Sequence, residues 1–127
     1  MKKTRIFFAI LIIMAFYGCS GSDTYRGLWK ATDLNGEKLE ILFNAKSFST
    51  KDSTGARSNF EYTQNSVSIE NSVRTYGIKL RDGRAYIIHF PLAGDQSKGI
   101  IKDDNDRPIY TIARDQYITY QDLYKLK

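Results

Sequence analysis

Polar and apolar residues alternate in short runs along most of the chain after residue 24. In Glu37–Phe43, for example, Leu39, Ile41 and Phe43 fall on one face and Glu40 falls on the other. Because successive side chains of a β-strand point to opposite faces, this period of two predicts strands with one buried face. The runs predicted as strands are Gly27–Leu34, Glu37–Phe43, Phe48–Lys51, Asn59–Gln64, Val67–Glu70, Thr75–Leu80, Ala85–Phe90, Lys98–Lys102 and Pro108–Arg114.

Turn-forming residues separate these runs. Asn35-Gly36 is the strongest short hairpin signal in the chain, and Arg81-Asp82-Gly83 is a second one. Asn65-Ser66 is expected to turn the chain between two of the short strands, and Asp103–Asp106 to form another polar turn. Short strands at regular spacing predict an all-β fold, either a small antiparallel β-barrel or a sandwich, with about eight to nine strands in meander order.

The C-terminal stretch changes its period. Thr119 is followed three residues later by Asp122, which is typical of the capped start of a helix. Tyr120, Leu123 and Tyr124 would then share one helical face. A short helix is favoured, although a last strand with Tyr120, Tyr124 and Leu126 facing inward fits the sequence nearly as well.

The first 18 residues have a different pattern. Lys2 and Lys3 lie in a basic start, and the run Ile6–Phe16 that follows is entirely apolar. This run is too short for a transmembrane helix, which needs about 20 apolar residues. Its length is typical of the apolar core of a secretory signal peptide. The small residue Gly18 then precedes Cys19, the single cysteine of the chain.

Phe16-Tyr17-Gly18-Cys19 resembles the lipobox of bacterial lipoproteins, with Phe16 where that family usually has leucine. The resemblance implies that residues 1–18 are a signal peptide cleaved after Gly18 and that Cys19 is lipidated with fatty acyl chains such as palmitate. Residues 19–24 would be a polar tether and residues 25–127 a single domain. In enterobacterial members of this family an aspartate after the cysteine retains the protein in the inner membrane, so Ser20 implies the outer membrane.

Two other interpretations of this segment stay open, a plain signal peptide with a chance cysteine and a short amphipathic anchor. The apolar run has no polar face, which argues against the second of these. A single cysteine also argues against a disulfide framework in the mature domain. Lipidation would use this one thiol.

Composition and charge exclude several classes of site. Cleavage would leave 16 Lys and Arg against 14 Asp and Glu without a basic stripe, so nucleic acid is not an expected partner. His89 is the only histidine, which leaves too few ligands for a zinc site or a catalytic triad. Asp103–Asp106 resembles a calcium loop but lacks the glycine that the EF-hand loop requires. We therefore expect no catalytic residues, no metal and no cofactor.

Gly27-Leu28-Trp29 resembles the G-x-W motif of lipocalin-like barrels. The resemblance implies that Gly27 and Trp29 belong to the barrel floor. It also implies that Arg114, at the end of a late strand, packs across the face of Trp29 through a cation–π contact.

The function predicted from these features is that of a lipid-anchored binding or inhibitory module of the cell envelope, without catalysis and with a protein partner. Large inward residues such as Phe43 and Phe60 favour a filled core and an external working surface, on loops such as Asp52–Arg57 and Pro91–Ser97 and on the C-terminal tyrosines. Tyr117, Tyr120 and Tyr124 are the candidate contact surface, since tyrosine offers apolar area with a polar tip. The alternatives are a lipocalin-like carrier of a small apolar ligand, and an enzyme with unrecognised carboxylate or Tyr/Lys chemistry.

Overall fold

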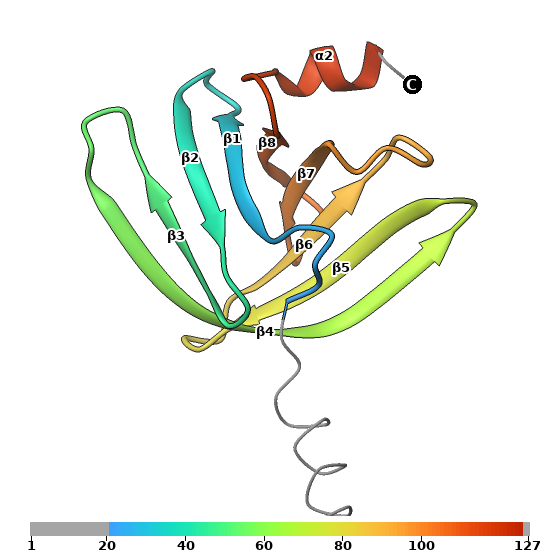
Figure 1. The fold of residues 1–127 in the computed structure, drawn as a ribbon, viewed down its shortest axis with the longest axis horizontal. Helices are drawn as coiled ribbons and strands as arrows, with labels where there is room; N and C mark the ends of the chain where they lie inside the picture. Colours follow the sequence, from blue (N-terminus) through green and yellow to red (C-terminus); the bar gives the residue numbers. More distant parts are fainter. Residues whose placement is uncertain (1–20, 126–127) are drawn as a thin grey trace, which may run out of the picture.

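The computed structural model describes residues 21–125, so the leader, Gly18 and Cys19 lie outside the described residues. The strands are β1 (Gly27–Asp33), β2 (Lys38–Phe43), β3 (Ser47–Lys51), β4 (Arg57–Glu70), β5 (Val73–Leu80), β6 (Ala85–Phe90), β7 (Lys98–Asp103) and β8 (Pro108–Ala113), followed by helix α2 (Tyr120–Lys125). Each strand pairs antiparallel with the next one, and β1 also pairs with β8 (Figure 1). The predicted all-β meander with a short C-terminal helix is confirmed, and the sheet closes into a barrel.

Strand β4 corrects one part of the sequence-based prediction. Asn59–Gln64 and Val67–Glu70 are predicted as two strands with a turn at Asn65-Ser66, but both lie in one strand of 14 residues. A register shift between Gln64 and Ser66 marks a bulge at the predicted turn. The first half of β4 pairs with β3 and the second half with β5. A bulge bends a strand without ending it, so β4 can follow the wall of the barrel.

Four hairpin turns, at residues 34–36, 53–55, 81–83 and 104–106, connect odd strands to the even strands that follow. The turns at 34–36, 53–55 and 104–106 share one end of the barrel, which we call the turn end. The turn at 81–83 lies across β4 from the turn at 44–46. In the first of the four turns Asp33 Oδ1 accepts hydrogen bonds from the backbone N–H groups of Asn35 and Glu37, each at 2.9 Å. Asp52 and Asp103 bond their turns in the same way. Gly36, with a φ of 83°, supplies the left-handed position that this turn requires.

The opposite end, which we call the tether end, carries the turns at 44–46, 71–72 and 91–97 and the segment 21–26. Gly21 donates its N–H to the Ala45 carbonyl at 2.7 Å, and its own carbonyl accepts from Arg26 Nε at 2.8 Å. Ser22 N–H donates to Gln64 Oε1 at 3.0 Å. A Cβ atom at Gly21 would overlap the Tyr62 hydroxyl, so glycine is the residue that fits here. The start of the described chain is therefore fixed across the tether end.

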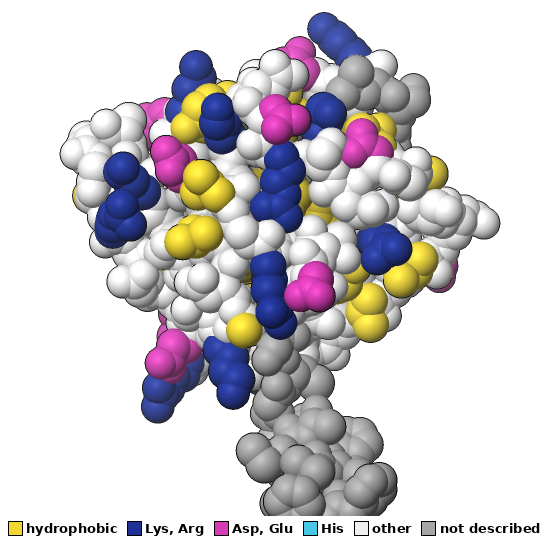
Figure 2. All heavy atoms as spheres, viewed as in Figure 1, with side chains coloured by type: hydrophobic (Ala, Val, Ile, Leu, Met, Phe, Trp, Pro, Cys, Tyr) yellow, Lys and Arg dark blue, Asp and Glu magenta, His cyan; other side chains and the backbone are white. Residues whose placement is uncertain are grey.

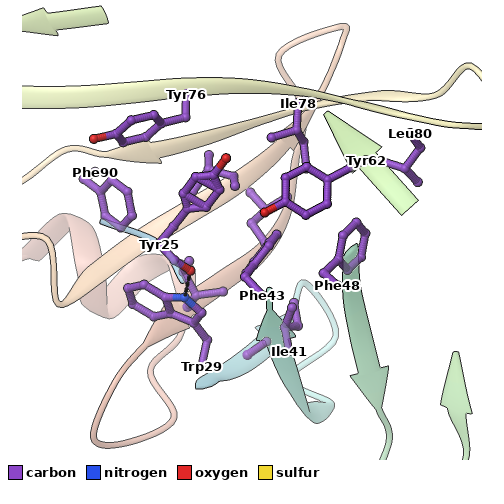
Figure 3. Packing of buried hydrophobic residues seen from close by; sticks show 14 residues of the cluster. Tyr25, Trp29, Ile41, Phe43, Phe48, Tyr62, Tyr76, Ile78, Leu80 and Phe90 are labelled. Carbon is purple, nitrogen blue, oxygen red and sulfur yellow. Dashed lines mark hydrogen bonds between the residues drawn. The ribbon is translucent and has the colours of Figure 1, made fainter. Parts of the chain in front are cut away.

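Aromatic and branched aliphatic side chains fill most of the barrel. Figure 3 shows rings from several strands converging on Tyr25 and Phe43, whose ring centroids are 5.2 Å apart. A second, smaller cluster lies outside the barrel, where Leu123 of α2 packs with Ile100 of β7 and Ala113 of β8. The helix begins as predicted, because Thr119 Oγ1 accepts a hydrogen bond from the N–H of Asp122.

Candidate functional site

Trp29 and Arg114 contact each other at the tether end of the barrel. Trp29 is fully buried, and its Nε1–H donates to the Tyr25 carbonyl at 2.8 Å (Figure 3). The guanidinium carbon of Arg114 lies 3.6 Å from the centroid of the Trp29 ring. Burial lowers the pKa of Arg114 from its usual value, but an arginine remains charged at any physiological pH.

Gly27 completes this group. Its φ of 101° lies in the region that favours glycine, and a Cβ atom there would lie 3.1 Å from Arg114 Nη1. The residues that the sequence assigns to the barrel floor, Gly27, Trp29 and Arg114, are thus brought together. Their contacts join strand β1 to the end of the last strand and close the barrel at the tether end.

A cavity of about 110 Å³ lies inside the barrel, toward the turn end. Its walls are nearly all apolar or aromatic, and Thr50 and Arg84 are the polar exceptions. The lining residues are Ile41, Phe43, Phe48, Thr50, Phe60, Ile78, Leu80, Arg84, Tyr86, Ile101 and Tyr110. The sequence predicts neither this cavity nor the place of Arg84 beside it.

Arg84 forms part of the cavity rim. Its guanidinium carbon lies 5.2 Å from the centroid of the Phe60 ring, and Phe60 stacks on Phe48 with 5.1 Å between centroids. Arg84 Nη1 donates to the Tyr86 hydroxyl at 3.3 Å, while Nε and Nη2 donate to Asp82 Oδ2 at 3.0 and 2.7 Å. These bonds lower the pKa of the Asp82 carboxyl, so Asp82 balances the positive charge of Arg84.

The outer surface at the turn end has a shallow apolar depression. Leu34, Pro108 and Ile109 lie in it, and Leu34 is 64% exposed. Asp33 pairs with Tyr110 in the sheet, so the β1–β2 turn that carries Leu34 lies next to one wall of the cavity. Figure 2 shows hydrophobic side chains scattered between charged ones on the viewed face.

The three C-terminal tyrosines of the candidate contact surface are half-buried. Tyr117 lies beneath the ammonium groups of Lys30 and Lys38, at 5.7 and 5.3 Å from its ring centroid. Tyr120 and Tyr124 are in ring contact at 4.8 Å and pack against the cluster around Leu123. The buried parts of these three side chains therefore pack the C-terminal segment against the barrel.

Comparison with known protein families gives no match, and comparison with curated proteins gives none either. Within residues 21–125, three or more His, Cys, Asp or Glu side chains nowhere gather as they would around a metal ion. No helix in the same range is long and apolar enough to cross a membrane. The cavity and the depression beside it are the hollows at the turn end that offer contact area to a ligand or a partner.

Proposed function

We propose that the protein is a lipid-anchored binding module of the bacterial cell envelope, held on the outer membrane through an acylated Cys19 and acting on a protein partner without catalysis. The lipobox resemblance and the position of Gly21 support this arrangement. Two peptide links separate Gly21 from Cys19, and they span at most about 7 Å. Since Gly21 is fixed at the tether end, the tether end would lie near the membrane and the turn end would face away from it.

The size of the cavity is the observation that carries the choice of an external protein partner. Pockets for drug-sized ligands usually have volumes of about 300–1,000 Å³. The barrel cavity of about 110 Å³ is too small for the chain of a fatty acid. Aromatic rings occupy the space that a carrier would keep open for its cargo. We therefore place the binding of the partner at the outer surface and at the rim of the cavity, and not in the barrel interior.

A carrier of a small apolar ligand is the second candidate, because the barrel is closed and its cavity is apolar. Native mass spectrometry of protein extracted from its own membrane separates the two candidates. A fatty acid or similar lipid bound one-to-one, in addition to the acyl chains on Cys19, would favour the carrier.

Site-specific photocrosslinking in living cells tests the proposed function directly. In one strain a photoreactive phenylalanine analogue replaces Asn35 at the turn end, and in a second strain it replaces Ala93 at the tether end. Asn35 and Ala93 are both exposed in the native protein. We expect Asn35 to give one discrete protein adduct and Ala93 to give none, because the partner would reach the turn end. Adducts from neither position, or from Ala93 alone, would contradict the proposal.

A further inference from the structure

We infer that the cavity at the turn end is a socket for one apolar side chain of the protein partner, with Arg84 and Tyr86 placed to hydrogen-bond the backbone beside that side chain. The inference rests on the proposed function, since it takes the partner to be a protein. It adds the place of contact and the chemistry that the partner must present.

The volume of the cavity sets the size of the group that it can hold. An engineered cavity of about 150 Å³ lined by Leu, Ile and Phe stays dry and binds benzene or xenon. The present cavity of about 110 Å³ is somewhat smaller and has similar walls, including Phe48, Ile78 and Ile101. A branched four-carbon side chain or a single ring is therefore the appropriate size. Protein interfaces commonly concentrate their binding energy in such anchor residues, which sit in desolvated pockets.

The rim favours a neutral hydrogen-bond acceptor. An arginine side chain has five N–H donors, and the bonds of Arg84 to Asp82 and Tyr86 use three of them. Asp82 already balances the positive charge of Arg84, so a second carboxylate would gain little there. A peptide carbonyl next to the inserted side chain is a neutral acceptor and would lie at the height of the rim.

The surroundings of the mouth suit a protein surface. Leu34, Pro108 and Ile109 provide apolar contact area at the same end of the barrel. The turns that carry Leu34 and precede Pro108 are held by Asp33 and Asp103, whose carboxylates each accept two backbone N–H groups. Turns held in this way are ordered before binding, which lowers the entropic cost of association.

The experiment uses the full-length lipidated protein in nanodiscs with ¹³C-labelled isoleucine methyl groups. Ile78 and Ile101 report on the cavity, and the exposed Ile69 serves as an internal reference. The probes are N-acetyl-leucine methylamide, which carries the side chain with its flanking carbonyls, and toluene, which carries a ring alone. We expect both probes to shift Ile78 and Ile101 saturably, with dissociation constants of about 1 mM for such small molecules, and to leave Ile69 unchanged.

Two matched variants test whether the probes occupy the cavity. Thr50→Phe places a ring in the cavity, and Thr63→Phe makes the same exchange at an exposed position of β4. We expect Thr50→Phe to weaken the binding of both probes at least tenfold and to abolish the crosslink from Asn35. Thr63→Phe should leave probe binding and the crosslink unchanged. The methyl spectrum itself shows whether each variant is folded.

Tyr86→Phe combined with Arg84→Gln provides a test that leaves the apolar walls in place. The double variant should bind N-acetyl-leucine methylamide about fivefold more weakly and bind toluene as the native protein does. Only the amide probe has a carbonyl that can accept a hydrogen bond from Arg84 or Tyr86. An equal loss of affinity for both probes would overturn the hydrogen-bonding role of Arg84 and Tyr86.

Three results would overturn the socket, namely no saturable shift with either probe, binding of toluene without the amide probe, or one-to-one binding of palmitate inside the barrel. An Asn35 crosslink that survives Thr50→Phe would also overturn the socket while leaving the proposed function intact. Saturable binding of the amide probe without any crosslinked protein would support the chemistry of the socket and overturn the proposed partner.

Discussion

The guanidinium of Arg114 lies 3.6 Å from the centre of the Trp29 ring and also donates to three backbone carbonyls near it. These carbonyls belong to Thr24, Arg26 and Leu28, at 3.2, 2.7 and 3.0 Å. One cation at the end of β8 thus holds the first strand and the segment before it. The closure of the barrel at the tether end depends on this side chain as well as on the β1–β8 ladder.

Arg114→Lys should destabilise the protein by about 2–3 kcal/mol. A lysine keeps the charge but cannot reach three carbonyls in the fixed fork of a guanidinium, and net hydrogen bonds to charged groups are worth about 1.5–3 kcal/mol each. Urea denaturation of the two proteins measures the difference. Arg107→Lys, at an exposed position in the β7–β8 turn, is the control and should change stability by less than about 0.5 kcal/mol. Equal effects of the two exchanges would contradict the closing role of Arg114.

The alternation of apolar residues predicted most of the barrel because each strand buries one face. Tyr76, Ile78 and Leu80 are predicted to point inward, and all three are at most 3% exposed. The same alternation does not predict the bulge in β4. Asn65-Ser66 suits a turn or a bulge equally well in local terms, and only pairing with both β3 and β5 decides between them.

The C-terminal helix was predicted from its cap, but the surface that receives it was not. Ile100 and Ile101 are both buried on adjacent positions of β7, one facing the outer cluster and the other facing the barrel interior. Successive apolar residues in a strand indicate burial on both faces, so this pair was the available signal. It indicates that an element covers the outer face of β7, but it does not identify Leu123 of α2 as part of that element.

The cavity at the turn end could not be predicted from residue sizes. Large inward residues suggest a filled barrel, and most of the interior is indeed filled. The remaining space depends on how rings stack, for example Phe48 on Phe60, and on the width of the closed sheet. Arg84 follows a hairpin turn and is exposed, so nothing in its sequence position separates it from an ordinary surface arginine.

Gly99→Ala should destabilise the protein by about 2 kcal/mol or more. A Cβ atom at Gly99 would lie 2.8 Å from a ring carbon of Phe90 and 2.9 Å from the carbonyl oxygen of His89. Phe90 is fully buried and the His89 carbonyl belongs to the sheet, so neither atom can move aside without cost. Thermal and urea unfolding measure the loss of stability.

Gly77→Ala is the matched control for this exchange. Its Cβ atom would meet side-chain atoms of the exposed residues Asn65 and Ser66, and not the backbone or a buried ring. We expect a change of less than about 1 kcal/mol. A larger loss at Gly77 than at Gly99 would show that the packing around Phe90 is looser than described.

Asp52 should contribute to the acid sensitivity of the protein. The Thr54 hydroxyl and the Ala56 N–H donate to its carboxylate and lower its pKa below the usual value of 3.8. The sign follows from linkage, because a carboxyl with a depressed pKa stabilises the folded state above the unfolded pKa. This stabilisation is lost as the pH falls below 3.8 and through the lower folded value.

Asp52→Asn isolates this effect, because an asparagine keeps the acceptor oxygen of the turn and removes the titration. We expect the variant to be less stable than the native protein at pH 7 and the gap to close as the pH falls below 3.8. Urea midpoints between pH 7 and pH 2.5 measure the gap. A gap of constant size over that range would show that the loss is due to geometry and not to ionisation.

The lipid anchor is tested by Cys19→Ser. Thioether formation needs the thiol, so the variant should keep its leader, incorporate no labelled palmitate and migrate as the longer precursor. Ser20→Asp is the control, since it keeps the thiol and should still be labelled, while the family resemblance implies that it moves the protein to the inner membrane.

The leader alone could still hold the Cys19→Ser precursor on a membrane, so fractionation is not sufficient and the label decides. If Cys19→Ser and the native chain incorporate equal amounts of palmitate, Phe16-Tyr17-Gly18-Cys19 is not a lipobox. The protein would then not be anchored through Cys19.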